Sequence, residues 1–423
     1  MEISGNGDQI TADILVVGGG IAGITAAIEA SEIGKSAVLV EKEPFLGGRV
    51  AKMNQYFPKL CPPLCGLEIN FKRLRFNDQV KIMTLTTVEE VTGKPGDFEI
   101  TLKVEPRYVK DDSPDFDEYV EACPIEVPNQ DNFGIDMHKA VYLPQMAYPS
   151  IYAVDPSVVN DDKFKSWAKG CKTDIFDLDM KPETVKVKAA AIIWATGWQP
   201  YDAAKIDNLG FGKHDNVVTN VIFERLASAD GPTQGKIQRP SDNAEIKKIG
   251  FVQCAGSRDE NHLPYCSAVC CAASIKQANY VREQHPEAEI HIFYIDVRTP
   301  GRLEDFYAST DEDEKIFFHR GKVAEVREVS GSKNLIVAAE NTLTGKITEM
   351  EMDMVVLATG MVPNSVECKP PVDAIMDDWG FLSSDTSSGV VGAGVASRPF
   401  DVAASVQDAT GSVLKALQMM NRS

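Results

Sequence analysis

Hydrophobic and polar positions between residues 13 and 41 are arranged as expected for one complete βαβ unit. The run Asp13-Ile-Leu-Val-Val17 predicts a buried strand, the alanine-rich residues 24–33 predict a helix, and residues 36–41 predict a second strand. A glycine-rich turn joins the first strand to the helix. We therefore expect a Rossmann-type unit here.

A second series of the same kind lies between residues 244 and 296. It consists of a strand at 249–253, a helix at 272–283 and a strand at 289–296. Two more apolar runs, 189–197 and 352–360, both end in Ala-Thr-Gly, which indicates two related halves. The pattern predicts an α/β fold with two Rossmann-like domains.

The intervening residues 105–182 have a different character, because they are rich in Asp, Pro and Lys and show weak periodicity. We interpret them as an irregular insertion. The late segment Gly389-Val-Val-Gly-Ala-Gly394 suggests that the chain returns to complete the first domain. The expected first domain thus comprises 1–104, 183–242 and 361–423, and the expected second domain comprises 243–360.

The turn after the first strand has the spacing of a dinucleotide-binding fingerprint, with Gly18, Gly20 and Gly23. The first glycine allows a tight turn, the second lets the backbone approach a pyrophosphate, and the third lets helix pack on strand. Ile21 and Ala22 would lie at the helix N-terminus, which favours negative charge. Glu41 ends the next strand and is placed to accept hydrogen bonds from a ribose.

The residues that follow favour FAD over NAD. The segment Pro44-Phe-Leu-Gly-Gly-Arg49 contains a glycine pair that lets a loop lie close to a cofactor. The first Ala-Thr-Gly and the late glycine segment occur in the order expected for the same site. The further candidate FAD-binding residues are Lys42, Gly48, Arg49, Ala195, Thr196, Gly197, Gly392 and Gly394.

Composition narrows the class of protein. The 423 residues are 43% hydrophobic and 25% charged, as in an ordinary globular protein. A net charge of −19 disfavours nucleic acid and anionic membrane surfaces as partners. Because we find no apolar stretch of 18 residues and no export signal, we expect a cytoplasmic protein that contacts a membrane only through partner subunits.

The nine cysteines point to metal, cluster or redox use more than to structural disulfides. After the strand at 249–253 a nicotinamide fingerprint is missing, and Cys254, Cys266, Cys270 and Cys271 stand there instead. Cys266 and Cys270 would share one face if the helix has begun. Four thiolates can bind a [4Fe–4S] cluster, but a redox thiol set or buried structural cysteines fit the spacing as well.

A second pair lies in Cys61-Pro-Pro-Leu-Cys65, soon after the first βαβ unit. This pair could be a catalytic dithiol, a redox-inert pair near the flavin, or half of a metal site. Cys123, Cys171 and Cys368 are isolated, so we interpret each as a structural residue.

Several segments together resemble the A subunit of heterodisulfide reductase. They are Val17-Gly-Gly-Gly-Ile-Ala-Gly23, Glu41-Lys-Glu-Pro-Phe-Leu-Gly-Gly-Arg49, Phe251-Val-Gln-Cys-Ala-Gly-Ser-Arg-Asp259, Tyr265-Cys-Ser-Ala-Val-Cys-Cys271 and Ser405-Val-Gln-Asp-Ala409. The resemblance implies a thioredoxin-reductase-type FAD domain, and a [4Fe–4S] cluster bound by Cys254, Cys266, Cys270 and Cys271.

The chain also departs from this family. Longer members carry a ferredoxin insert at 105–182, where only Cys123 and Cys171 remain of the ligand motifs, and a C-terminal ferredoxin that is missing near Ser423. A short member with these losses is similar to the A subunits of quinone-interacting membrane-bound oxidoreductase (Qmo) complexes of sulfate-reducing bacteria. That resemblance implies three partners: a sister flavoprotein, adenylylsulfate reductase and a quinone-reactive membrane subunit.

The resulting hypothesis is a flavin-dependent oxidoreductase subunit in which FAD handles electron pairs and the cluster carries single electrons to a partner. An NAD(P)H-dependent disulfide reductase using Cys61 and Cys65 is the alternative enzyme, weakened by the missing second fingerprint. The alternative that is not an enzyme is a scaffold protein whose flavin is structural. The sequence leaves open the direction of electron flow.

Overall fold

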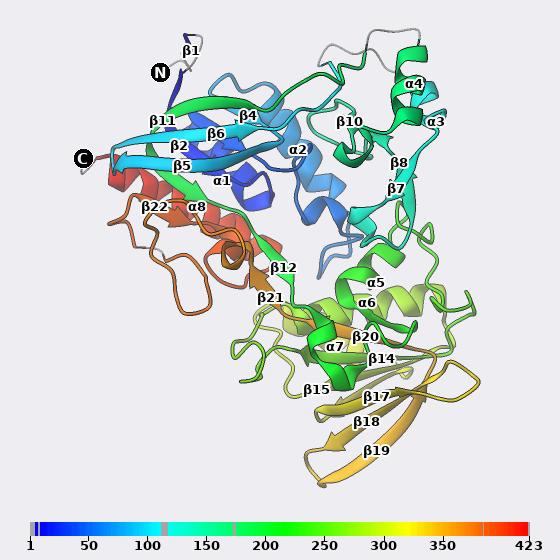
Figure 1. Ribbon diagram of the computed structural model, residues 1–423. Coiled ribbons are helices and arrows are strands. Elements are labelled where there is room, and N and C mark those ends of the chain that lie inside the picture. Colours follow the sequence, from blue (N-terminus) through cyan, green and yellow to red (C-terminus); the bar gives the residue numbers. More distant parts are fainter. Residues whose placement is uncertain (1–4, 7–8, 111–116, 172–174, 384, 422–423) are drawn as a thin grey trace. The chain divides into compact units, whose positions relative to one another are not determined.

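The computed structural model describes residues 5–6, 9–110, 117–171, 175–383 and 385–421. Two compact units are present (Figure 1). The first comprises Met1–Lys52, Leu64–Trp198 and Pro363–Ser423, and the second comprises Met53–Pro63 and Gln199–Val362. Each unit is built on its own sheet, as the two predicted βαβ series require.

The first unit contains an eight-stranded mixed sheet with the order β4-β3-β2-β11-β6-β5, in which β1 also pairs with β2, and β22 with β11. The strands β2, β3, β4, β11 and β22 are parallel, whereas β6 and β5 are antiparallel additions. The bounds are β1 Gly5–Asn6, β2 Gln9–Val17, β3 Ala37–Val40, β4 Val80–Met83, β5 Thr86–Lys94, β6 Asp97–Val104, β11 Glu183–Trp194 and β22 Val390–Gly392.

Three helices accompany this sheet: α1 Ile21–Glu32, α2 Leu64–Arg75 and α8 Val402–Met420. α8, at the red end of the chain in Figure 1, packs against α1 and β11, so the C-terminal segment completes the domain that the N-terminus begins. The central strands are buried on both faces, since Ile14, Leu15 and Val16 are fully inaccessible. This burial explains why β2 reads as a continuous apolar run rather than an alternating one.

Residues between β6 and β11 form a small substructure with its own core. Its elements are α3 Asp117–Glu121, β7 Glu126–Pro128, β8 Met137–Lys139, β9 Val141–Tyr142, β10 Ala153–Val154 and α4 Asp162–Gly170. β7 pairs with β8, β9 pairs with β10, and side chains such as Phe164 and Val141 are fully buried. Parts of the expected insertion, residues 111–116 and 172–174, lie outside the described residues.

The second unit has a parallel five-stranded sheet with the order β13-β20-β14-β15-β16. Its strands are β13 Val217–Thr219, β14 Lys248–Ala255, β15 Glu289–Tyr294, β16 Ile316–Arg320 and β20 Met354–Thr359. Its helices are α5 Asn220–Leu226, α6 Cys270–Gln284 and α7 Leu303–Asp311. The chain runs from β14 through α6 to β15 on one side, while β20 lies on the other side of β14, so the strand order reverses between β14 and β20.

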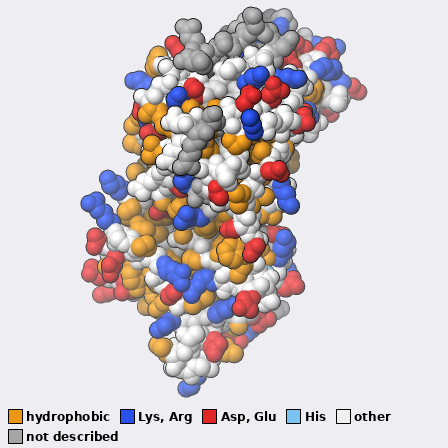
Figure 2. Space-filling view, turned by 90° about the vertical axis from the view of Figure 1, so that its left-hand side faces the viewer, with side chains coloured by type: hydrophobic (Ala, Val, Ile, Leu, Met, Phe, Trp, Pro, Cys, Tyr) orange, Lys and Arg blue, Asp and Glu red, His pale blue; other side chains and the backbone are white. Residues whose placement is uncertain are grey.

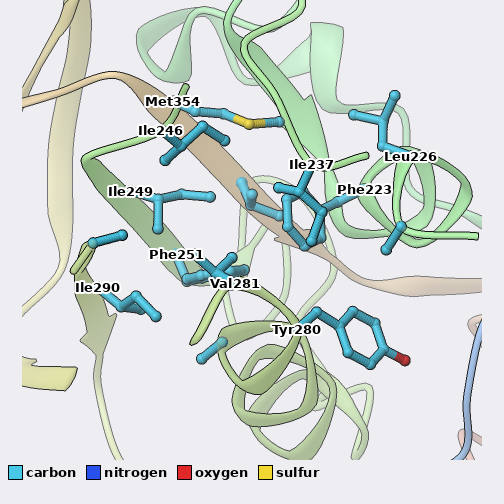
Figure 3. Close-up of a cluster of buried hydrophobic side chains, with 14 of the residues drawn as sticks. Phe223, Leu226, Ile237, Ile246, Ile249, Phe251, Tyr280, Val281, Ile290 and Met354 are labelled. Atoms are coloured by element: carbon cyan, nitrogen blue, oxygen red, sulfur yellow. The ribbon is translucent and has the colours of Figure 1, made fainter. Parts of the chain in front are cut away.

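The core of this unit lies between the sheet and its helices (Figure 3). Phe251 on β14 meets Phe223 on α5 edge to face, with ring centroids 5.7 Å apart, and Val281 of α6 packs in the same cluster. An antiparallel three-stranded sheet adds to this unit, with β17 Val323–Glu328, β18 Leu335–Asn341 and β19 Lys346–Met352. Two short strands that pair with each other, β12 Trp198–Pro200 and β21 Met361–Pro363, lie where the chain crosses between the units.

The unit boundaries differ from two of our expectations. Residues 199–242, expected in the first domain, belong to the second unit, because β13 pairs with β20 and α5 contributes Phe223 to that core. Residues 53–63, also expected in the first domain, belong to the second unit as well, where Leu60 packs against the same cluster.

None of the helices in the described part of the chain is long and apolar enough to cross a membrane. On the face drawn in Figure 2, acidic, basic and apolar side chains are interspersed. On that face, the excess of acidic residues is therefore not gathered into one region.

Candidate functional site

The glycine turn lies at the carboxyl end of β2, and steric contacts explain its glycines. A Cβ on Gly18, whose φ is +107°, would lie 2.4 Å from the carbonyl oxygen of Ala195, and a Cβ on Gly23 would lie 1.8 Å from that of Gly18. Around Gly20 the structure is open, with no described heavy atom within 4 Å of a Cβ. The turn is therefore closed on two sides and open at Gly20, where a pyrophosphate would approach the N-terminus of α1.

Glu41 follows β3 and is buried beside this turn. Its Oε2 accepts a hydrogen bond from the Gly19 amide at 2.6 Å, and its Oε1 accepts one from the Glu43 amide at 2.8 Å. Burial raises the pKa of the carboxyl, and the two amides oppose that rise. Glu41 thus fixes the turn, while each oxygen retains a lone pair that a ribose hydroxyl could use. The neighbouring Lys42 is exposed and its Nζ lies 3.7 Å from Glu43.

The loop at 44–49 lies against the glycine turn. The Gly47 amide donates to the Gly19 carbonyl at 2.8 Å, and a Cβ on Gly48 would lie 3.0 Å from the Cα of Gly20. Arg49 donates from Nε to the Trp198 carbonyl at 2.6 Å, and its guanidinium stands 4.7 Å from the centroid of that indole. Burial lowers the pKa of Arg49 to about 10.

Two other segments reach the same edge of the sheet. Ala195, Thr196 and Gly197 follow β11, and the hydroxyl of Thr196 is buried without a hydrogen-bond partner among the described residues. A Cβ on Gly394 would lie 2.7 Å from Ala22 of α1, and the Gly394 amide donates to Asp408 at 2.8 Å. The orphaned hydroxyl and the open face of Gly20 fit a dinucleotide at this edge.

The sequence-predicted FAD residues therefore converge within the first unit. The turn, Glu41, Gly48, Arg49, the Ala-Thr-Gly segment, Gly392 and Gly394 all lie at or beyond the carboxyl ends of β2, β3, β11 and β22. Lys42 differs from the others, because its side chain is exposed and paired with Glu43.

Four cysteines, the first of them near the end of β14, gather at the carboxyl edge of the second sheet. Cys254 lies in a register shift between β14 and β20 and has a φ of +54°, which is uncommon for a residue with a side chain. Cys270 and Cys271 are the first two residues of α6. Since α6 begins at Cys270, Cys266 lies in the preceding loop, and the idea that both share one helix face is wrong.

Contacts from adjacent strands hold the thiols. Cys270 Sγ donates to the Thr359 carbonyl at the end of β20 at 3.8 Å, and Cys271 Sγ donates to the Asp296 carbonyl beyond β15 at 3.7 Å. Cys266 Sγ accepts from the amide of Ala268 at 3.4 Å. The site therefore lies where the strand order reverses, the usual ligand position in open α/β sheets.

The electrostatics show that these thiols interact with one another. Burial, together with the charges of Cys271 and Cys266, raises the pKa of Cys254 to about 11, and Arg258 opposes this rise. Burial also raises the pKa of Cys270 well above its ordinary value, with contributions from all three other thiols, and that of Cys271. Metal binding would have to displace the protons.

Among the described residues, no three His, Cys, Asp or Glu side chains are arranged to hold a single metal ion. A cubane places each thiolate on a different iron, so its ligands stand further apart than those of one ion. Two of the four interacting thiols lie at the N-terminus of α6, which suits the negative charge of such a cluster. The donor set thus fits a [4Fe–4S] cluster better than a mononuclear metal.

Of the other five cysteines, Cys61 belongs to the second unit and four belong to the first unit. All nine are free thiols, and Cys61 and Cys65 fall in different units, with Cys65 exposed on α2. Cys123 is buried in the core of the insertion, and burial together with the charge of Cys123 raises the pKa of Cys171. Cys368 is exposed.

Sequence reasoning missed two sets of charged residues in the second unit. Asp296 forms ion pairs with both Arg258 and Arg298. Lys276 of α6 forms an ion pair with Glu224 of α5. Arg258 stands in the Cys-Ala-Gly-Ser-Arg-Asp segment, which was a usable signal. Nothing local to Asp296 or Glu224 indicated a role.

Comparisons with known proteins agree with this description. Residues 13–60 match the family of FAD-dependent oxidoreductases. Solved thioredoxin reductases share the fold: that of T. acidophilum has a TM-score of 0.51 at 15% identity, covering 97% of this chain and 98% of that one. The Lactococcus lactis enzyme has a TM-score of 0.52 at 14% identity, covering 97% and 100%.

Curated relatives are much more similar in sequence. The second of two iron-sulfur A subunits of the CoB–CoM heterodisulfide reductase of Methanopyrus kandleri is 38% identical over 96% of this chain and 64% of its own length. The A subunit of the H2:CoB-CoM heterodisulfide, ferredoxin reductase of Methanothermobacter thermautotrophicus is 36% identical over 95% and 63%. The chain thus spans slightly less than two thirds of these relatives. It has a thioredoxin-reductase-like two-domain fold, carries an FAD-dependent oxidoreductase domain and is homologous to heterodisulfide reductase A subunits over nearly its whole length.

Proposed function

We propose that this chain is the electron-transfer subunit of a flavin-dependent oxidoreductase, with FAD in the first unit and a [4Fe–4S] cluster in the second. The observation that carries the proposal is the group of four interacting thiols at the carboxyl edge of the second sheet. A two-dinucleotide flavoprotein would bind its nicotinamide cofactor at that edge.

The chain's own residues bind and position the flavin. The amides at the N-terminus of α1 and the open face of Gly20 receive the pyrophosphate, Glu41 receives the ribose, and Thr196 supplies a hydroxyl that needs a partner. FAD can exchange electrons in pairs or singly, whereas a cubane exchanges them singly. Cys254, Cys266, Cys270 and Cys271 hold the cluster.

We further propose that the chain works within a larger complex, because its relatives are named as subunits. The relatives are named for heterodisulfide reduction in methanogens. Our finer proposal is a Qmo-type complex, whose other members and partners are a sister flavoprotein, adenylylsulfate reductase and a quinone-reactive membrane subunit. The protein would then be cytoplasmic and attached to the inner face of the membrane through that complex. The Qmo-type proposal is supported by the insertion at 105–182. This insertion retains only Cys123 and Cys171, which are too few thiolates for a ferredoxin relay.

Anaerobic purification followed by flavin and iron analysis tests the main proposal. We expect one FAD and about four irons per chain, an EPR signal after dithionite, and no bleaching of the flavin by NADH. An iron-free protein that NADH bleaches rapidly would instead be a disulfide reductase of the Cys61 and Cys65 kind. Bound flavin without iron or bleaching would indicate a scaffold.

The finer proposal is tested with the reduced protein. Oxidation by adenylylsulfate reductase, but not by the CoB–CoM heterodisulfide with its reductase subunits, supports a Qmo-type role. The reverse preference contradicts it and leaves the electron-transfer proposal intact.

A further inference from the structure

Asp296 joins two arginines beyond the carboxyl end of β15. Its Oδ1 accepts from Nη1 of Arg258, and its Oδ2 accepts from Nη2 of Arg298 at 3.3 Å and from Nε at 3.4 Å. One carboxylate between two guanidiniums leaves the trio with a net charge of +1. All three side chains are partly exposed, at 23% for Arg258, 48% for Arg298 and 45% for Asp296.

The same trio interacts with three of the four clustered cysteines, one of them through a hydrogen bond. The main-chain carbonyl of Asp296 accepts from the Cys271 thiol at 3.7 Å. Arg258 also interacts electrostatically with the Cys254 thiol, and Arg298 interacts electrostatically with the Cys266 thiol. The net positive charge of the trio therefore acts on the thiols as well as on the solvent.

The backbone fixes Arg258 in this place. Its φ is +57°, an uncommon conformation for a residue with a side chain, and its amide donates to the Tyr265 carbonyl at 3.1 Å. The amide of the following Asp259 donates to the Leu263 carbonyl at 3.0 Å, so the loop folds back on itself. Such strained positions gather where a structure must hold a side chain in one place.

We propose that Arg258 and Arg298, held by Asp296, raise the reduction potential of the cluster bound by the four cysteines. The inference rests on the cluster assigned in the proposed function. A cluster with four thiolate ligands carries negative charge and gains another when it accepts an electron. A nearby cation and hydrogen bonds to sulfur stabilise the reduced form more than the oxidised form.

The test is an EPR-monitored redox titration of the intact, cluster-loaded protein, with iron and FAD measured in every sample. Arg258→Gln and Arg298→Gln should each shift the midpoint potential downward, and the double variant should shift it further. Arg258→Lys and Arg298→Lys keep the positive charge, so their midpoint potentials should lie closer to that of the wild type than the potentials of the glutamine variants. Asp296→Asn raises the charge of the trio to +2 and should shift the potential upward, a sign that general disruption of the loop would not produce.

The matched control is Arg282→Gln. Arg282 lies in the last turn of α6 and pairs with Asp313 at 2.8 Å, so the same charge is removed at the other end of the same helix. Its midpoint potential should equal that of the wild type. If Arg258→Gln fails to load iron, Arg298→Gln and Asp296→Asn still test the inference. Their midpoint potentials are expected to shift in opposite directions.

Two results would overturn the inference, and they differ from each other. Full iron with an unchanged potential in both arginine variants contradicts the inference and leaves the proposed function standing. A wild-type protein that binds FAD but no iron contradicts the cluster itself, and the inference falls with it.

Discussion

Lys276 and Glu224 form an ion pair inside the second unit, with Nζ 2.7 Å from Oε1 and side chains only 2% and 8% exposed. The same Glu224 oxygen accepts from the amides of Asn54 and Gln55 at 3.0 and 3.3 Å, and Lys276 also donates to the Gln55 carbonyl at 2.8 Å. The pair therefore joins α5 and α6 to the segment Met53–Pro63, which precedes them by more than 150 residues in the sequence.

Removing one partner of this pair should destabilise the protein strongly. Lys276→Met leaves the Glu224 carboxylate buried without its cation, which typically costs about 3–5 kcal/mol. Urea unfolding at pH 7 measures the loss. The control Lys213→Met breaks an exposed pair with Asp207 and should cost less than about 1 kcal/mol. Equal losses in the free energy of unfolding would show that the buried pair contributes no more to stability than the exposed pair.

The glycine turn gives a prediction that separates cofactor binding from folding. Gly20→Ala places a methyl group in open space, so the apoprotein should keep its stability while FAD affinity falls at least about tenfold, or roughly 1.4 kcal/mol. Gly23→Ala drives its Cβ into the Gly18 carbonyl and should impair folding itself. Flavin content and FAD titration of refolded apoprotein measure both.

The control for this series is Gly411→Ala. Gly411 lies within α8, and a Cβ there meets no described heavy atom within 4 Å. Helix propensity predicts a gain of about 0.5–1 kcal/mol with unchanged FAD binding. Normal FAD affinity in Gly20→Ala would contradict a pyrophosphate at that position.

Hydrophobic runs predicted the elements well but not their grouping into units. The strand expected at 249–253 is β14, Lys248–Ala255, and the helix expected at 272–283 is α6, Cys270–Gln284. The local pattern could not show that residues 53–63 belong to the second unit. That membership reflects long-range contacts, such as the hydrogen bond from Lys276 to the Gln55 carbonyl and the packing of Leu60, which leave no periodicity in the segment itself.

In the candidate site too, the local sequence indicated some residues, whereas others are recognised only from long-range contacts. The sequence singled out Cys254, Cys266, Cys270 and Cys271 as candidates, and the structure places them at one strand end, in one loop and at the start of one helix; their role as ligands stays a prediction. Asp296 was not found, since its role arises from β15 lying next to β14 in the sheet. Contacts between neighbouring parallel strands are set by topology, which a single stretch of sequence does not encode.

Stability should fall with acidification because of His291. Its Nδ1 lies 2.8 Å from Nε2 of His319, and burial, followed by the charges of His319 and Lys248, lowers its pKa to about 4, while Glu289 opposes this. The unfolded chain protonates near pH 6.5, so it binds more protons than the folded chain between those values. His291 therefore does not reduce the free energy of unfolding well above pH 6.5, and it reduces that free energy progressively as the pH falls toward 4.

The measurable consequence is a loss of about 1.5 kcal/mol in the free energy of unfolding between pH 6.5 and 5. Urea unfolding at both pH values should show this loss in the wild type and a smaller one in His291→Gln, although that variant is less stable at pH 7. Most carboxylates with lowered pKa titrate below this window. Equal slopes in the two proteins would assign the pH dependence to other groups.

Cys270 offers the most direct test of the four-cysteine site. The residue is 5% exposed, lies at the start of α6 and interacts electrostatically with the other three thiols, so Cys270→Ser removes a proposed ligand with little change in volume. Iron should fall well below about four per chain, while FAD stays at the wild-type level because its residues lie in the other unit. The control Cys368→Ser alters an exposed thiol in the first unit and should retain both cofactors. Full iron occupancy with an unchanged EPR signal in Cys270→Ser would show that Cys270 is not a ligand, and the cluster would then need a different set of cysteines.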